Sequence, residues 1–260
     1  MVMKIENYAG TADAFTFPHN PNTFDDTLDA NFTFSNIAYQ RHHIAISGGG
    51  INPLSIILTG HMDGSTKLAN YRNLRRHIQE NTQLKKLYFE TDKFYLGIGR
   101  QIKKTNSGGR TNFIDYVATY QTIIGILFDN TQQTYTNGGG QLTNGGDVTT
   151  FIEEISGDVT SGAADITISD AEGNAIKIPA ASLTTGQTVV VTFVKMVDSG
   201  SGIYVTEYNY ATVAGAQIKT VQTTTGFGLI QLAAAGSTST ISVGNLDAGF
   251  TVKFRNGWSG

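Results

Sequence analysis

The residues best suited to chemistry in this sequence are its histidines, because the chain has five of them and no cysteine. The lack of cysteine excludes disulfides, thiolate metal sites and cysteine nucleophiles. His42 and His43 are adjacent, and adjacent side chains of a strand point to opposite faces, so this pair cannot chelate one ion. His19, His61 and His77 stand far apart, and no H-x-x-x-H or HExxH spacing occurs. The sequence therefore predicts structural or surface roles for the histidines and no metal site.

Acidic pairs offer a second kind of chemistry, because glycoside hydrolases place two carboxyl groups across a cleft. The candidates are Asp25–Asp26, Asp29 and Glu153–Glu154. No GxSxG or SxxK nucleophile motif is present, and the glycine runs lack the Lys-Ser/Thr of a phosphate-binding loop. We interpret the carboxylates as solvated loop and strand-edge charges, so the sequence indicates no enzyme and no cofactor.

Basic residues concentrate between positions 67 and 110, although the whole chain has a net charge of −3. Such a block, which includes Lys85 and Lys86, could contact nucleic-acid phosphates. The chain is mildly acidic and lacks the usual nucleic-acid readers, so a basic rim that faces another protein is favoured. Charge complementarity fixes orientation between subunits. The candidate subunit-interface residues are Arg72, Arg75, Arg76, Lys103, Lys104 and Arg110.

Trp258 is the only tryptophan and stands two residues from the end of the sequence. Its ring offers a stacking surface for a sugar, which makes it a candidate glycan contact. The favoured alternative is that Trp258 closes a β-sandwich after a strand at 250–254, because aromatic side chains bury a large area where they pack.

The elements that must position these residues are mostly strands. In the first half, alternating or apolar runs predict strands at 32–37, 40–46 and 54–59. Asp63, Gly64 and Ser65 then provide a turn and an N-cap for a helix that runs to about Glu80. An apolar stripe suited to packing on a sheet is formed by Leu68, Tyr71, Leu74 and Ile78.

A long hairpin follows the helix. Alternating apolar residues predict a strand around 94–98, and the Asn-Ser-Gly-Gly-Arg segment at 106–110 has hairpin-turn chemistry. The next apolar run, 113–128, is longer than the usual strand of about 3–10 residues, so we expect it to extend beyond the domain or to bend at Gly125. The tip at 103–110 is expected to reach another subunit, since an isolated hairpin is marginally stable in water.

The second half is predicted to be a separate all-β domain. The Gly/Asn-rich stretch 135–146 is expected to be a linker between domains 1–134 and 147–260. Charged residues are only 15% of the chain, against about 25% in typical domains. Short strands predict an antiparallel sandwich with no helix except a turn near 232–235; they are expected at 151–155, 165–169, 175–178, 187–197, 203–210, 228–232, 240–243 and 250–254.

No membrane or export segment is expected. No run approaches the 18 or so apolar residues that span a bilayer. The first residues include Lys4, Glu6 and Asp13 and have no apolar h-region, so they do not form a signal peptide. We therefore expect the protein to be made and folded in a cytoplasm, without membrane insertion.

Two segments of the first half hold the helix and the hairpin: LTGHMDGSTKLANYRNLRRHIQENTQLKKLYFETDKFYLGIGR at 58–100 and FIDYVATYQTIIGILFDN at 113–130. Both segments resemble the distal tail protein (Dit) family of long-tailed bacteriophages. In the second half, TNGGDVTTFIEEISG at 143–157 resembles the start of that family's C-terminal domain. ITISDAEGNAIKI, LTTGQTVVVTF and TVKFRNGWSG resemble its sandwich strands and aromatic finish. Residues 1–31 have no counterpart in the pattern.

The resemblance implies a structural virion protein of the phage tail tip or baseplate. It implies a mainly β fold, in which an N-terminal β-sandwich or barrel with one helix and a long hairpin precedes a galectin-like or carbohydrate-binding-module-like sandwich. The partners implied are further copies in a hexameric ring, the tail tube protein and the hub or fibre protein, with DNA only passing through. Because each phosphate contact steepens the salt dependence of DNA binding by about 0.9 in log–log slope, we expect the basic residues to face away from the channel.

Three alternatives remain open. A tail-tube subunit would share a related β fold but stack into extended tubes. A carbohydrate-binding module would use residues 147–260 to contact host glycans. A glycan hydrolase would depend on the unassigned carboxylates alone.

Overall fold

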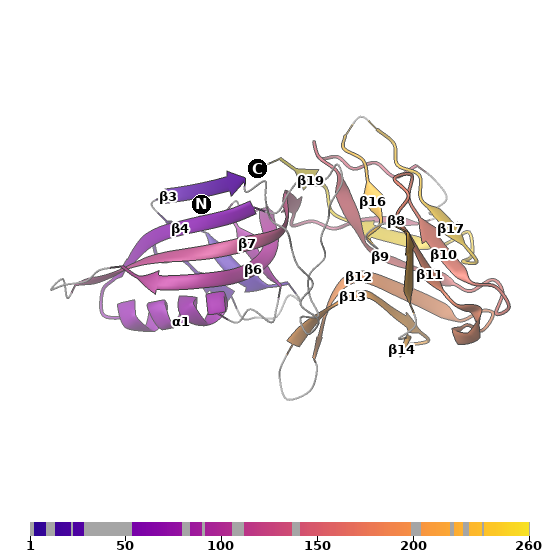
Figure 1. Ribbon diagram of the computed structural model, residues 1–260, viewed down its shortest axis with the longest axis horizontal. Helices are drawn as coiled ribbons and strands as arrows, with labels where there is room; N and C mark the ends of the chain where they lie inside the picture. Colours follow the sequence, from indigo (N-terminus) through magenta and orange to yellow (C-terminus); the bar gives the residue numbers. More distant parts are fainter. Residues whose placement is uncertain are drawn as a thin grey trace. The chain divides into compact units, whose positions relative to one another are not determined.

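The structure is a computed structural model, which describes residues 3–8, 14–21, 23–28, 54–79, 84–89, 92–105, 112–136, 141–198, 204–218, 221–225, 229–235 and 237–259. The strands predicted at 32–37 and 40–46 lie outside the described residues, as do His42, His43, Asp29 and Arg110. The chain forms two compact units (Figure 1), the first mainly Met1–Leu127 and the second Phe128–Val197 with Thr206–Ser259. Each unit is described by itself below.

The first unit is one sheet covered by one helix. Its elements are β1 (Lys4–Asn7), β2 (Ala14–Thr16), β3 (Thr23–Leu28), β4 (Leu54–Asp63), α1 (Lys67–Gln79), β5 (Lys85–Tyr88), β6 (Lys93–Lys104) and β7 (Phe113–Asp129). The strand order is β2-β1-β5-β6-β7-β4-β3. Strand β4 pairs antiparallel with both β3 and β7. The mainly β fold predicted from the sequence is confirmed.

The sheet must curl, because β2 and β3 are consecutive in the chain yet lie at opposite ends of the strand order. The link between them spans at most roughly 24 Å at about 3.4 Å per residue. In a flat sheet of seven strands spaced about 4.8 Å apart, the two outer strands would lie about 29 Å from each other, which is farther than this link reaches. The sheet is therefore curved, whereas the choice between a sandwich and a barrel stays a prediction. The core that it shares with α1 includes Ile5, Phe15, Ile56, Leu58, Leu74, Ile78, Tyr95, Tyr116 and Tyr120.

Helix α1 begins after a tight turn at Gly64, whose φ of +71° suits glycine. Leu74, His77 and Ile78 are buried, and Tyr71 packs against the core. Leu68 differs from the prediction, because this residue is 48% exposed. Each step of three residues falls short of a full helical turn by about 60°, so Leu68 and Leu74 lie about 120° apart around the axis. The predicted apolar stripe therefore winds around α1, and Leu68 no longer lies on the side of the helix that is buried.

Strand β6 approaches α1 closely at Gly99. A Cβ atom at this position would lie 2.3 Å from the carbonyl oxygen of Ile78 and 2.6 Å from its Cα. Real Cβ atoms essentially never come this close to backbone, so only glycine allows this helix–sheet distance.

Strand β7 is long because it serves both units. It pairs with β4 from Phe113, opposite Asp63, to Gln121, opposite Ser55. It then continues unbroken through Gly125 to Asp129, which belongs to the second unit. The extension beyond the first unit lies at the C-terminal end of the strand, whereas the alternative of a bend at Gly125 stays a prediction. The expected crossing of the 103–110 tip to another subunit stays a prediction, since 106–111 lie outside the described residues.

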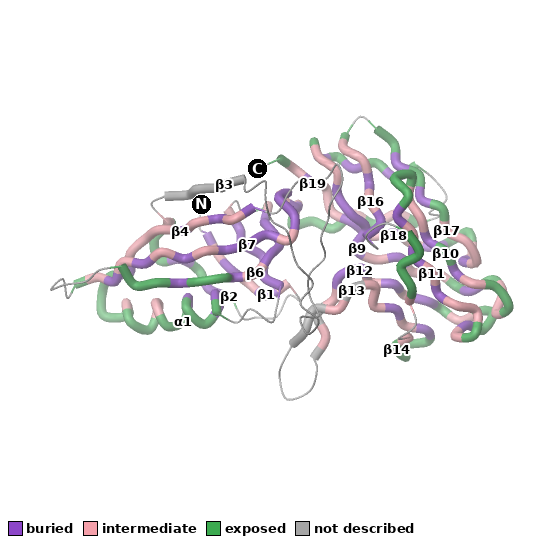
Figure 2. The backbone as a smooth tube through the Cα atoms, viewed as in Figure 1, coloured by how far each residue is buried: buried purple, intermediate pink, exposed green. Residues whose placement is uncertain are grey.

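The second unit is an antiparallel β-sandwich, as predicted (Figure 1). One sheet has the order β15-β11-β10-β17, and the other has β14-β13-β12-β9-β18-β8 with β16 beside β9. Alternating residues of β10 and β11 are buried, including Ile166, Ile168, Ile176 and Ile178, which form the inner face (Figure 2). The strands are β8 (Gln133–Thr136), β9 (Thr150–Asp158), β10 (Ile166–Ser169), β11 (Ala175–Ile178), β12 (Thr188–Asp198), β13 (Tyr204–Val213), β14 (Ala216–Ile218), β15 (Gln222–Thr225), β16 (Gln231–Leu232), β17 (Ser242–Gly244), β18 (Thr251–Phe254) and β19 (Gly257–Trp258).

The described part of the predicted linker is built into the second unit. Strand β8 pairs with β18, and Leu142 forms a bridge with Ser239. The second unit begins at Phe128, a few residues before the predicted boundary at 134. The second unit also contains a short 3₁₀ helix, η1 (Ala180–Ser182), although the sequence predicted no helical structure there except a turn near 232–235. In the described part of the chain, no helix has the length and apolarity needed to cross a membrane.

Candidate functional site

Three of the predicted interface residues lie on the exposed side of α1. Arg72, Arg75 and Arg76 are exposed, and Leu68 is exposed beside them. At about 100° per residue, these four side chains lie within roughly 100° of one another around the helix axis. We call these four residues the outward face of α1. Arg75 Nε donates to Gln79 Oε1 at 2.7 Å, which holds its side chain along the helix.

The remaining described candidates, Lys103 and Lys104, are exposed at the end of β6. Strand β6 is also the strand that α1 contacts most extensively. Within the described residues, Arg72, Arg75, Lys103 and Lys104 form no ion pair. In the second unit, by contrast, Lys177, Lys253 and Arg255 each pair with a carboxylate. The first unit therefore displays positive charge that the described part of the chain does not neutralise.

Lys85 and Lys86 do not join this basic surface. Lys85 is fully buried, and its Nζ donates to Asn7 Oδ1 at 2.6 Å. Lys86 is 8% exposed and lies 3.8 Å from Glu6 Oε1. The strands β1 and β5 pair and place these side chains together, a contact that no local sequence pattern indicates. The predicted block is thus partly internal structure, which weakens its interpretation as a nucleic-acid site.

Glu6 is the acidic centre of this internal group. Tyr88 Oη donates to Glu6 Oε1 at 2.6 Å, and Lys4 Nζ donates to Glu6 Oε2 at 2.9 Å. Burial by itself raises the pKa of Glu6, but the hydrogen bonds from Tyr88 and Lys4 and the charges of Lys4 and Lys86 outweigh it and lower the pKa. The group is thus a satisfied structural network.

The acidic pair Glu153–Glu154 has structural partners. Arg255 Nε lies 2.8 Å from Glu153 Oε1, and Lys253 Nζ lies 2.6 Å from Glu154 Oε1. Adjacent residues of a strand point to opposite faces, so these two carboxylates do not face each other across a cleft. Glu153 is buried, unlike the solvated charge expected from the sequence. The side chains of Asp25 and Asp26 lie outside the description.

Trp258 is anchored in the second unit. Its indole Nε1 donates to Asp129 Oδ1 at 2.7 Å, and Asn256 Nδ2 donates to the other oxygen of Asp129 at 2.9 Å. The side chain is only partly exposed. This geometry agrees with the structural role favoured above, whereas the role of Trp258 in glycan binding stays a prediction.

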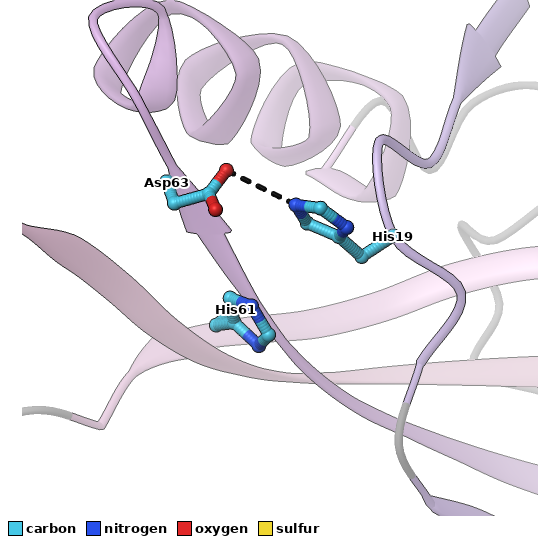
Figure 3. A group of neighbouring side chains, drawn as sticks. All are labelled: His19, His61 and Asp63. Atoms are coloured by element: carbon cyan, nitrogen blue, oxygen red, sulfur yellow. Dashed lines mark hydrogen bonds and ion pairs between the residues drawn. The ribbon is translucent and has the colours of Figure 1, made fainter.

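The structure brings together a histidine cluster that the sequence analysis missed. His19, His61 and Asp63 gather at the end of β4 (Figure 3), and their ligand atoms lie within 4.8 Å of one another. His19 Nε2 is 3.0 Å from Asp63 Oδ1, and this hydrogen bond lowers the pKa of Asp63. The H-x-D spacing at 61–63 was the available signal, because alternate residues of a strand share a face. The third residue, His19, comes from the segment between β2 and β3, and its contact with Asp63 is one that spacing alone does not reveal.

Comparison with solved structures finds similar chains, two of which come from phage proteins. No protein-family model matches the chain, and no curated protein matches it in sequence. The chain is similar to the Dit protein (gp 19.1) of phage SPP1, described as a paradigm of the hub adsorption apparatus in phages that infect Gram-positive bacteria. That match has a TM-score of 0.46, 10% identity and coverage of 79% of each chain. A chain of the phage P2 baseplate, in its activated conformation with Ca, has a TM-score of 0.44 and 11% identity over 98% of this chain and 97% of that chain.

Proposed function

We propose that this chain is a structural, non-enzymatic protein of a phage tail tip that assembles into a closed ring of identical subunits. Six copies are expected from the resemblance of segments 58–100 and 113–130 to the Dit family. In this proposal the ring joins the tail tube protein to the hub or fibre protein of the virion. DNA passes through the centre without being gripped.

The outward face of α1 is the single observation that carries this proposal. Leu68 is the exposed large hydrophobic side chain of the described residues, and Arg72, Arg75 and Arg76 surround it on the same side of the helix. Arginine is enriched in protein interfaces, whose centres are more apolar than their polar rims. An apolar centre with an arginine rim is therefore an arrangement suited to binding another protein.

A second copy of this chain is the partner that fits this face. Neighbours in a ring meet through two different surfaces, so a basic face on one copy contacts another part of the next. The second half of the chain has an excess of acidic residues, while the whole chain has a net charge of −3. Complementary charge orients such contacts and speeds association.

Neutralising the arginines tests the assembly role. The triple variant R72Q/R75Q/R76Q should weaken self-association by about tenfold or more, because three rim charges at up to about 1 kcal/mol each are lost. Mass photometry or sedimentation velocity at several protein concentrations measures the shift. The assembly of the wild-type chain should also weaken as salt is raised, since salt screens exposed charges.

A charge-matched control separates this contact from a general charge effect. The variant Q222E/T223E/T225E changes exposed residues of β15 and lowers the net charge by the same amount. It should assemble like the wild type. If the arginine variant assembles as well as the wild-type chain, the outward face of α1 is not part of the interface.

A further inference from the structure

The end of β4 carries three side chains of the kinds that bind metal ions, shown in Figure 3. They are His19, His61 and Asp63, whose ligand atoms lie within 4.8 Å of one another. We propose that these residues form a binding site for a divalent transition-metal ion, specifically Zn²⁺, on the first unit. The proposal is independent of the tail-tip function.

The sheet places two of the three residues on one face. His61 and Asp63 are two residues apart on β4, so their side chains project from the same side of the strand. His19 comes from the segment between β2 and β3, and its Nε2 lies 3.0 Å from Asp63 Oδ1. The backbone of β4 therefore supplies part of the preorganisation that a metal site requires.

The donor set matches zinc better than the hard cations. Two imidazoles and one carboxylate are a known ligand set of zinc sites, with a fourth position left for water. Calcium and magnesium take oxygen ligands, so two imidazoles disfavour them. Asp115 is paired with His61 on β7 and thus shares its face, which adds a second carboxylate near the cluster.

Only small side-chain movements are needed to close the site. Tetrahedral zinc with bonds of about 2.0–2.1 Å holds its ligand atoms roughly 3.4 Å apart. The side chains of His19 and Asp63 are 46% and 56% exposed, so they can rotate without disturbing the core. The ring of His61 stacks on His19 at 5.1 Å and contacts Phe113 edge-on at 6.3 Å, which limits its orientation.

An exposed ion pair is the simpler alternative. It accounts for the contact of His19 with Asp63, which is 3.0 Å long. Such exposed ion pairs contribute about 0–1 kcal/mol to folding stability. An ion pair this weak does not explain why a third polar side chain lies beside it. The alternative gives no role to His61, whose stacked ring brings a third ligand group to the same place.

Zinc titration of the full chain, prepared without a histidine tag, tests the proposal. Isothermal titration calorimetry should show saturable, equimolar Zn²⁺ binding that excess Mg²⁺ does not displace. The single variants H61N and D63N should each weaken binding by about 100-fold or more, because even outer-shell substitutions cost 10–100-fold. The double variant H42N/H43N is the matched control and should bind like the wild type.

Cobalt substitution provides a second readout. Bound Co²⁺ should give visible d–d absorption from a low-coordinate nitrogen and oxygen site, and H19N should abolish it. Circular dichroism of H19N, H61N and D63N should match the wild type, since these three side chains lie outside the core. The proposal would be overturned if the wild type shows no saturable Zn²⁺ binding, or if H61N and D63N bind Zn²⁺ as tightly as the wild type. The cluster would then be an exposed ion pair.

Discussion

Replacing Gly99 with alanine should destabilise the first unit by about 3 kcal/mol or more. The added Cβ would lie 2.3 Å from Ile78 O, 2.6 Å from its Cα and 2.7 Å from its carbonyl carbon. These are backbone atoms of α1, so no flexible side chain can move away to relieve the clash. Overpacking typically costs about 1–3 kcal/mol, and here the helix must shift from a sheet whose core includes Leu74 and Ile78.

Hydrogen exchange measured by mass spectrometry under increasing denaturant should detect this change, because it separates the two units. Peptides from α1, β4 and β6 should lose protection in G99A, while peptides from the second unit should not. The neighbouring variant R100A removes an exposed side chain of the same strand and is the control. If the free energies of unfolding of G99A and R100A differ by less than about 0.5 kcal/mol, then α1 does not pack against Gly99 as closely as described.

Replacing Asn144 with alanine should destabilise the second unit by about 3 kcal/mol. Asn144 is buried, and its Nδ2 donates to the carbonyls of Val148 at 2.6 Å and Ala233 at 3.1 Å. Its Oδ1 accepts from the backbone N–H of Gly146 at 2.9 Å and of Gly257 at 3.2 Å. Each buried group left without a partner costs about 1–3 kcal/mol. One side chain thus joins three separate segments of the unit.

Chemical denaturation with the tryptophan fluorescence of Trp258 as the probe follows this unit, because Trp258 directly follows Gly257. The variant T143A changes an exposed neighbour and should keep wild-type stability. N144D replaces both donors with a carboxylate oxygen that faces the carbonyls of Val148 and Ala233, so it should destabilise the unit at least as much as N144A. Equal stability of N144A and T143A would show that the Asn144 contacts do not hold these segments together.

The predictable parts of this fold were those with a strong local pattern. The helix of the first unit, β11 and most sandwich strands follow from local periodicity and turn residues, such as Gly173 with its φ of +87°. The short strands β1, β2 and β5 were missed, because too few residues alternate within them. Strand β5 is buried at every position, so it shows no polar–apolar alternation.

The candidate functional residues also divide into those that a local pattern predicts and those that depend on contacts between distant segments. The exposure of Arg72, Arg75 and Arg76 follows from helical spacing, so the sequence was sufficient to predict it. The burial of Lys85 depends on the pairing of β5 with β1, and His19 meets Asp63 through a side-chain contact between distant segments. Spacing along the sequence shows neither. The glycine-rich stretch before β9 looked like a linker, because the contacts of Asn144 come from remote parts of the chain.

Negative-stain electron microscopy of the purified full chain, with particle mass recorded alongside, tests the central claim most directly. The tail-tip account predicts discrete closed rings with an open centre, whose mass is six times the 27.9 kDa of one chain. Extended stacked tubes would instead identify a tail-tube subunit. Monomers at every protein concentration, including the highest that remains soluble, would contradict assembly through the outward face of α1.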